Sequence, residues 1–335
     1  MSRIAILGSG AWGTAIALSL DRRGGHQVTL WAHSYEEAQQ IVSARENSQF
    51  LPGFPIPSRI AVTADCAAIS AADIVVSVIP SEFLRATFLR IRSHLRIGQF
   101  VVSATKGLED RTLYRMTKVL SSTLEPAGLL LSIGALSGPS FALEVAQGQP
   151  TAITVAFSDP QVAALIQQEF SSESLRLYTS TDVIGVELGG ALKNVIAIAA
   201  GVAAGVGLGY NSTAALITRG IAEITRLAVA CEAQRETLAG LSGVGDLVLT
   251  CTGSLSRNRT VGQALGQGRQ LPEILESLGG KVAEGVLTTR AALGLARSRA
   301  IEMPITEQME LILDQGKDPR EAIKDLMLRP GKHEH

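Results

Sequence analysis

Two hydrophobic patterns follow one another along the chain, and the change between them limits the folds it can adopt. In the first half, short β-branched runs such as RIAIL (3–7) alternate with helical patterns such as 11–23. Strands that alternate with helices indicate a parallel sheet covered by helices on both faces. Beyond about residue 181 every segment is helical. The sequence therefore predicts a doubly wound α/β domain over 1–180 and an all-helical domain over 181–335, with a cleft between them.

The same patterns place the individual elements. The expected strands cover residues 3–7, 27–31, 73–79, 99–104, 129–135, 151–157 and 175–180. The expected helices cover residues 11–23, 35–46, 81–93, 110–121, 183–208, 212–234, 260–267, 272–277, 285–299, 304–315 and 319–328. The helix at 35–46 is expected to open with a capping box, Ser34-x-x-Glu37.

A glycine motif, GSGAWGTA, comes directly after the first expected strand and opens the first expected helix. In dinucleotide-binding folds, Gly8 would make the tight turn and Gly10 would let the backbone approach a pyrophosphate. Gly13 would let the helix pack closely on the strand, and the helix N-terminus attracts the anion. The alternative is a glycine-rich turn that binds nothing, and the strand–turn–helix context disfavours it. The first domain is therefore predicted to be a Rossmann-like fold that binds NAD or NADP.

The residues from Trp31 to Ser34 end the second strand, where NAD-selective folds place an acid on the ribose 2′-hydroxyl. This segment reads WAHS and contains no Asp or Glu. A carboxylate would repel a 2′-phosphate, so its absence predicts that both cofactors are accepted and that NADPH is preferred. His33 could hydrogen-bond the 2′-phosphate, but it is explained equally well as an exposed histidine at a strand end.

Composition excludes several other classes of protein. The net charge is −1, Lys and Arg are scattered, and aromatic residues make up 4%, so we expect no nucleic acid partner. Three distant cysteines and five histidines without metal-ligand spacing predict no metal and a cytoplasmic location. The Ala/Gly-rich run at 195–209 is shorter than the roughly 20 residues of a membrane span. We therefore expect no membrane span, whereas a helical domain of this composition can pair into a homodimer.

Three polar clusters follow expected strands of the first domain, where ligands of doubly wound sheets bind. The first, SVIPSEF (77–83), ends a strand with a Pro turn that is suited to supporting the cofactor. Lys106 comes just after the strand at 99–104. The segment SGPS (137–140) follows the strand at 129–135 and is expected to form a turn. Ser140 and the backbone of Gly138 could contact a ligand. The alternatives are an ordinary surface lysine and a serine that only forms the turn.

Lys193 interrupts an apolar Gly/Ala/Val run at the start of the second domain. A nicotinamide-dependent dehydrogenase that acts on an alcohol needs a group to take the hydroxyl proton, and no histidine is suitably placed. Burial in an apolar helix disfavours the charged ammonium form, so the setting itself could make the amine a base. The alternative is a lysine that reaches to the surface at a helix edge.

A Gly-rich stretch at 241–262 is expected to connect two helices as a long polar loop. Asp246 would lie in a tight turn of this loop. Ser256, Arg257 and Asn258 precede a helix whose N-terminus could help to bind a phosphate group. A solvated loop is the alternative for this stretch, and helix capping is the alternative for Glu284.

Seven motifs along the whole chain now resemble one family, the bacterial NAD(P)-dependent glycerol-3-phosphate dehydrogenases. The motifs are GSGAWGTA (8–15), TKG (105–107), SGPSFA (137–142), GALKN (190–194), GVGDL (243–247), SRN (256–258) and EG (284–285). GALKN together with SRN is specific, whereas the glycine motif alone is not. Even the tail DPREAIKDLMLR is similar to the end of that family.

The resemblance implies a cytosolic enzyme that interconverts dihydroxyacetone phosphate and sn-glycerol 3-phosphate and supplies phospholipid synthesis. The implied catalytic residues are Lys193, Lys106 and Asp246, with Lys193 as proton acceptor. The implied substrate contacts are Lys106, Gly138, Ser140, Lys193, Asp246, Ser256, Arg257 and Asn258. The implied cofactor contacts are Gly8, Gly10, Ala11, Trp12, Gly13, His33, Lys106, Ala142, Arg257, Val282 and Glu284. Similar enzymes often carry Arg at or near the position of His33. This chain therefore departs from the family pattern at that position.

Two alternatives remain open from the sequence. A related dehydrogenase of 3-hydroxy acids also uses a lysine on the first helix of its second domain, although Arg257 followed by Asn258 argues for a phosphate. A non-catalytic redox sensor would keep the glycine motif but would have no need of Lys193, Asp246 and Arg257.

Overall fold

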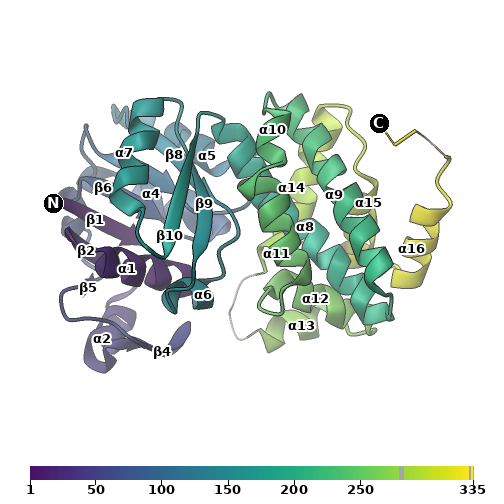
Figure 1. Cartoon of the computed structure of the whole chain (residues 1–335), viewed down its shortest axis with the longest axis horizontal. Coiled ribbons are helices and arrows are strands. Elements are labelled where there is room, and N and C mark those ends of the chain that lie inside the picture. Colours follow the sequence, from purple (N-terminus) through teal and green to yellow (C-terminus); the bar gives the residue numbers. More distant parts are fainter. Residues whose placement is uncertain (279–282, 332, 335) are drawn as a thin grey trace. The chain divides into compact units, whose positions relative to one another are not determined.

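The computed structural model describes residues 1–278, 283–331 and 333–334. The chain divides into two compact units (Figure 1). The first unit comprises residues 1–109 and 114–187, and the second comprises residues 110–113 and 188–335. The first unit contains all the described strands, and the second is helical.

The elements of the first unit alternate as the sequence predicts. Its strands are β1 (Ser2–Leu7), β2 (His26–Trp31), β3 (Glu46–Asn47), β4 (Leu51–Pro55), β5 (Ala61–Thr63), β6 (Ile74–Ser77), β7 (Phe100–Ser103), β8 (Ser132–Ser137), β9 (Thr151–Ala156) and β10 (Leu175–Ser180). Its helices are α1 (Ala11–Arg23), α2 (Tyr35–Ala44), α3 (Ala67–Ser70), α4 (Ser81–Ile91), α5 (Met116–Leu124), α6 (Ala142–Ala146) and α7 (Pro160–Phe170), with 3₁₀ turns η1 (Arg92–His94) and η2 (Glu125–Ala127). The sequence patterns do not predict β3, β4, β5, α3, α6 and α7, most of which are short.

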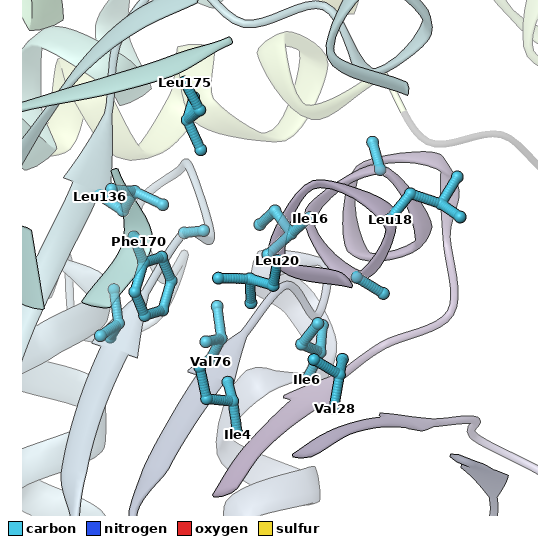
Figure 2. Packing of buried hydrophobic residues seen from close by; sticks show 14 of the residues in the cluster. Ile4, Ile6, Ile16, Leu18, Leu20, Val28, Val76, Leu136, Phe170 and Leu175 are labelled. Carbon is cyan, nitrogen blue, oxygen red and sulfur yellow. The ribbon is translucent and has the colours of Figure 1, made fainter. Parts of the chain in front are cut away.

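Eight strands form one sheet in the order β10-β9-β8-β7-β6-β1-β2-β5. Residues of β1 show why the sheet is covered on both faces. Ile4 and Ile6 belong to a buried cluster that includes residues of α1 and α7, whereas Ala5 and Leu7 belong to a second cluster that includes residues of α4 and α5. In Figure 2, Ile16 and Leu20 of α1 lie over Ile6 and Val76 of the sheet. Alternate residues of a strand point to opposite faces, so an almost continuous apolar run is buried on both sides.

One part of the predicted sheet is wrong, because β9 runs antiparallel to β8. The two strands pair through Ser137 with Thr154 and Ala135 with Ala156. Gly138 has φ +146°, and a Cβ there would come within 2.9 Å of the Cα of Ile153. This close approach lets β9 return along the end of β8. Since β10 is parallel to β9, both strands are reversed relative to the rest.

The helix predicted at 110–121 begins later, at Met116. The carboxylate of Glu187 accepts hydrogen bonds from the Thr117 N–H at 2.7 Å and from the Thr117 hydroxyl at 2.6 Å, and it also pairs with Arg115. This carboxylate satisfies the first turn of α5. The residue that sets the start of the helix is 70 positions away, so local sequence could not reveal it.

The second unit is built around α8 (Val183–Val206), whose first residues belong to the first unit. The other helices are α9 (Tyr210–Ala230), α10 (Arg235–Leu238), the π turn η3 (Leu241–Gly245), α11 (Asp246–Thr252), α12 (Arg257–Gly266), α13 (Leu271–Ser277), α14 (Glu284–Ser298), α15 (Pro304–Gln315) and α16 (Pro319–Met327). α8 has 24 residues, which is long enough to cross a membrane, but 89% of its most apolar window is buried inside the protein. It is therefore a core helix.

Candidate active site

The glycine motif forms the tight turn that the sequence predicts between β1 and α1. Gly8 has φ +114°, and its N–H donates to the carbonyl of Trp31 at 3.0 Å, so the turn is bonded to the end of β2. A Cβ on Gly13 would lie 1.9 Å from the Gly8 carbonyl oxygen, which explains why a side chain is excluded there. A Cβ on Gly10 would meet nothing within 4 Å. The space that a side chain would fill at Gly10 fits the approach of a pyrophosphate, and it lies at the N-terminus of α1.

A buried asparagine holds this turn, and the sequence analysis missed it. The Asn47 side-chain amide donates to the Ser9 carbonyl at 2.5 Å and to the Thr14 hydroxyl at 2.8 Å. Asn47 is 2% exposed and lies in β3, a strand of only two residues. No periodicity or motif marks such a residue. It bonds one residue of the glycine turn and one residue of α1, so it fixes the turn relative to the helix.

Replacing Asn47 with leucine, which has a similar volume, is expected to weaken cofactor binding about tenfold. The Ser9 carbonyl would lose a buried donor, and an unsatisfied buried polar group costs about 1–3 kcal/mol. Titration of the reduced nicotinamide fluorescence measures the dissociation constant. Gln49→Leu is the control, because it removes an exposed amide two residues away. An unchanged affinity in folded Asn47→Leu protein would show that the turn does not depend on this bond.

The other predicted cofactor contacts of the first unit lie around the same turn or beside it. Ala11 and Trp12 form the first turn of α1 and pack against the hydrophobic cluster of Figure 2. His33 is exposed just beyond β2. Ala142 is the first residue of α6, a helix that packs against α1.

Lys106, Gly138 and Ser140 come together at the ends of β7 and β8. The Lys106 amine donates to the Gly138 carbonyl at 3.3 Å, and the Ser140 hydroxyl donates to the same oxygen at 3.0 Å. Thr105 anchors the segment before Lys106, because its hydroxyl donates to the Ile79 carbonyl at 2.8 Å. Two of the predicted clusters therefore form one polar group at the carboxyl edge of the sheet.

In the second unit, Lys193 of α8 is buried and faces α11. Its amine donates to a carboxylate oxygen of Asp246 in a short contact, and to the Thr250 hydroxyl at 2.7 Å. The side chains of Lys193 and Asp246 are 8% and 1% exposed. The Thr250 hydroxyl also donates to the Asp246 backbone carbonyl at 2.6 Å. The structure thus brings Lys193 and Asp246 together and adds Thr250, which the sequence analysis missed.

This arrangement corrects one expectation about Lys193. Its surroundings were expected to be apolar and so to disfavour the ammonium form, but the Asp246 carboxylate stands against the amine. An adjacent negative charge favours the protonated amine.

The segment around Asp246 was expected to be a loop, but it is helical. η3 and α11 cover Leu241–Gly245 and Asp246–Thr252. Gly243 makes this possible, since a Cβ there would lie 2.0 Å from the Leu238 carbonyl. Asp246 opens α11, where a carboxylate is favourable near the helix N-terminus. The sequence showed the glycines but not the close packing that they allow.

Asn258 links three helices of the second unit. Its amide donates to the Asn194 side-chain oxygen at 3.0 Å, and its own side-chain oxygen accepts the Gly285 N–H at 3.0 Å. Asn194 lies on α8, next to Lys193, and Gly285 lies in the first turn of α14. Asn258 therefore fixes α12 and α14 against the helix that carries the lysine.

The remaining predicted contacts of the second unit lie at helix starts. Ser256 is the N-cap of α12, and its hydroxyl accepts the Arg259 N–H at 3.2 Å. Arg257 is the first residue of α12, earlier than the predicted start near 260, and it is exposed. Glu284 is the first residue of α14. Val282 lies outside the described residues.

Cys251 lies beside Asp246 in the packing of α11 but is not a nucleophile. Burial raises the pKa of its thiol to about 12, so the thiol stays neutral at physiological pH. Within the residues that the structure describes, no group of three His, Cys, Asp or Glu side chains could hold a metal ion.

Comparisons with known proteins agree over the whole chain. The models of the N-terminal and C-terminal parts of NAD-dependent glycerol-3-phosphate dehydrogenase match residues 3–163 and 182–324. The chain is 59% identical to the glycerol-3-phosphate dehydrogenase (NAD(P)+) of Acidobacterium capsulatum, with 100% of both chains covered. It is 56% identical to the protein of that name from Koribacter versatilis, covering 100% of this chain and 99% of the relative.

A solved structure is also similar. The crystal structure of a glycerol-3-phosphate dehydrogenase from Coxiella burnetii has 37% sequence identity and a TM-score of 0.93, and the match covers 98% of this chain and 99% of that one. These matches confirm the resemblance that the seven motifs indicated, and they confirm the predicted fold class.

Proposed function

The chain belongs to the family of NAD-dependent glycerol-3-phosphate dehydrogenases, and on that premise we propose that it interconverts dihydroxyacetone phosphate and sn-glycerol 3-phosphate. The reaction uses NAD(H) or NADP(H) and supplies glycerophospholipid synthesis in the cytoplasm. Residues 1–180 bind the dinucleotide, and residues 181–335 carry the substrate and catalytic groups. The Ala/Gly-rich helical part also pairs with a second copy of the chain as a homodimer.

One observation carries the proposal, namely the buried set of Lys193, Asp246 and Thr250. Reduction of a ketone places negative charge on its oxygen, and a buried ammonium group next to that oxygen stabilises the charge. Lys193 then donates its proton to the oxygen. Asp246 stabilises the ammonium form of Lys193, so the amine takes up a proton from water again after the transfer, while Thr250 holds the amine in place. In the reverse direction Lys193 accepts the hydroxyl proton.

The phosphate of the substrate is assigned to the start of α12. Arg257 is exposed at the first position of this ten-residue helix, where the guanidinium and the helix N-terminus both attract an anion. Ser256 caps the helix, and Asn258 is held by Asn194 and Gly285. These two residues therefore set the position of Arg257. Ser140 and the Gly138 backbone are the proposed substrate contacts of the first unit.

The cofactor is assigned to the first unit. Gly8, Gly10 and Gly13 and the N-terminus of α1 hold its pyrophosphate, which fits the open space at Gly10. When bound, the reduced nicotinamide supplies the hydride that the carbonyl carbon receives. Lys106 is the proposed catalytic residue of the first unit and is also assigned as a cofactor contact. The other assigned contacts of the first unit are Ala11, Trp12, His33 and Ala142. Three residues of the second unit, Arg257, Val282 and Glu284, are also proposed cofactor contacts.

The loss of reduced-nicotinamide absorbance tests the proposed reaction. Purified protein is mixed with dihydroxyacetone phosphate and either NADH or NADPH, and we expect turnover with at least one cofactor. Turnover with 3-oxo acids instead would identify a 3-hydroxy acid dehydrogenase. Binding of cofactor without turnover of any phosphorylated triose would identify a redox sensor. Size-exclusion chromatography with light scattering measures the oligomeric state.

A further inference from the structure

Glu37 of α2 places a carboxylate at the glycine turn, although the residues directly after β2 include no acid. It lies in the first turn of α2, where its N–H donates to the hydroxyl of the N-cap residue Ser34 at 3.2 Å. In the predicted capping box the Glu37 carboxylate would also accept the backbone N–H of Ser34. No such hydrogen bond is present among the described residues. The carboxylate accepts the hydroxyl of Ser9 instead, at 2.5 Å. Ser9 stands between Gly8 and Gly10, so the carboxylate is bonded to the turn itself.

The position of Glu37 matches the place where dinucleotide folds recognise the adenosine ribose. The Gly8 N–H is bonded to the Trp31 carbonyl at 3.0 Å, so the glycine turn and the end of β2 are neighbours. In such folds an acid at the end of the second strand accepts a hydrogen bond from the ribose 2′-hydroxyl. The segment after β2 contains no acid, and Glu37 reaches the same neighbourhood from α2. A side chain in a helix leans toward the N-terminus of that helix, which directs it to this end.

We infer that Glu37 selects between the two cofactors. Its carboxylate accepts the ribose 2′-hydroxyl of NAD(H) and repels the 2′-phosphate of NADP(H). Glu37 is only half-buried, so the repulsion is moderated by water. This effect opposes the NADPH preference predicted from the absence of an acid at the end of β2. The inference rests on the proposed function only in assuming that the glycine turn binds a dinucleotide.

A purely structural role for Glu37 makes a different prediction. The bond to Ser9 could serve only to hold the turn, together with Asn47, which bonds the Ser9 carbonyl. Loss of the carboxylate would then loosen the turn and weaken both cofactors equally. Selection by charge instead changes the ratio of the two affinities, because only one cofactor carries the 2′-phosphate.

Glu37→Gln separates these roles, because glutamine keeps the size and an acceptor oxygen but removes the charge. We expect the dissociation constant for NADPH to fall about tenfold and that for NADH to rise by less than about threefold. Fluorescence titration with each reduced cofactor measures both values without any turnover. Glu36→Gln is the matched control, since it removes the same charge from the adjacent, exposed position of α2.

The outcomes separate this inference from the proposed function. A tighter NADPH complex in Glu37→Gln and unchanged affinities in Glu36→Gln support the inference. An equal loss of both affinities, an unchanged ratio, or the same shift in both variants overturns it, even if the wild-type protein turns over dihydroxyacetone phosphate. Absence of any cofactor binding by the wild-type protein would reject the proposed function itself.

Discussion

Replacing Lys193 with methionine is expected to lower the turnover of dihydroxyacetone phosphate by roughly 10²–10⁴-fold. The amine is the one that touches both Asp246 and Thr250, and its loss removes the proton donor for the developing alkoxide. The dissociation constant of the cofactor should change by less than about threefold, because the glycine turn belongs to the other unit. Initial rates and fluorescence titration measure the two effects separately.

A second variant distinguishes loss of the proton donor from loss of the folded structure. Methionine leaves the Asp246 carboxylate buried without its ion pair, which typically costs about 3–5 kcal/mol. Lys193→Arg keeps a positive charge beside Asp246, but a guanidinium does not release its proton. We expect this variant to melt near the wild-type temperature and still to lose turnover. Lys324→Met, at an exposed position of α16, is the control. Near-normal turnover in either Lys193 variant would contradict the assigned role.

Replacing Gly262 with alanine is expected to destabilise the second unit by about 3 kcal/mol. A Cβ at Gly262 would lie 1.9 Å from the carbonyl oxygen of Ile198 on α8, so the two helices would have to separate. Three more glycines lie at the same crossing. A Cβ would lie 2.1 Å from the Arg259 carbonyl at Gly201, 2.2 Å from the Gln263 carbonyl at Gly205, and 2.4 Å from the Val202 carbonyl at Gly266.

The measurement is the free energy of unfolding from urea denaturation, with turnover as a second readout. Separation of α8 from α12 would also strain the bond between Asn194 and Asn258, so we expect activity to fall in the protein that remains folded. Gly209→Ala is the matched control, because a Cβ there meets nothing within 4 Å. It should cost less than about 1 kcal/mol. Equal stability of both variants would mean that the helices can shift apart at little cost.

The sequence alone determined the features that depend on neighbouring residues. Buried strands such as β1 and β6 are marked by β-branched runs, and the helices α1 and α15 begin and end where their patterns predict. The glycine turn was identified because Gly8, Gly10 and Gly13 lie between a strand and a helix. Lys193 was noticed because a charge in an apolar helix is costly. Each of these signals lies within a few residues of the feature that it predicts.

Only the tertiary structure decided which partners these residues have. Asp246 is 53 positions from Lys193, and Glu37 is 28 positions from Ser9. Three other features likewise depend on distant partners or on backbone contacts. Glu187 sets the start of α5, Gly138 allows the reversal of β9, and Gly243 allows the helical form of α11. Hydrophobic periodicity reports which face of an element is buried but not what packs against that face. Partner identity is set when the chain closes on itself, because ion pairs and close backbone contacts join residues that are separated along the chain.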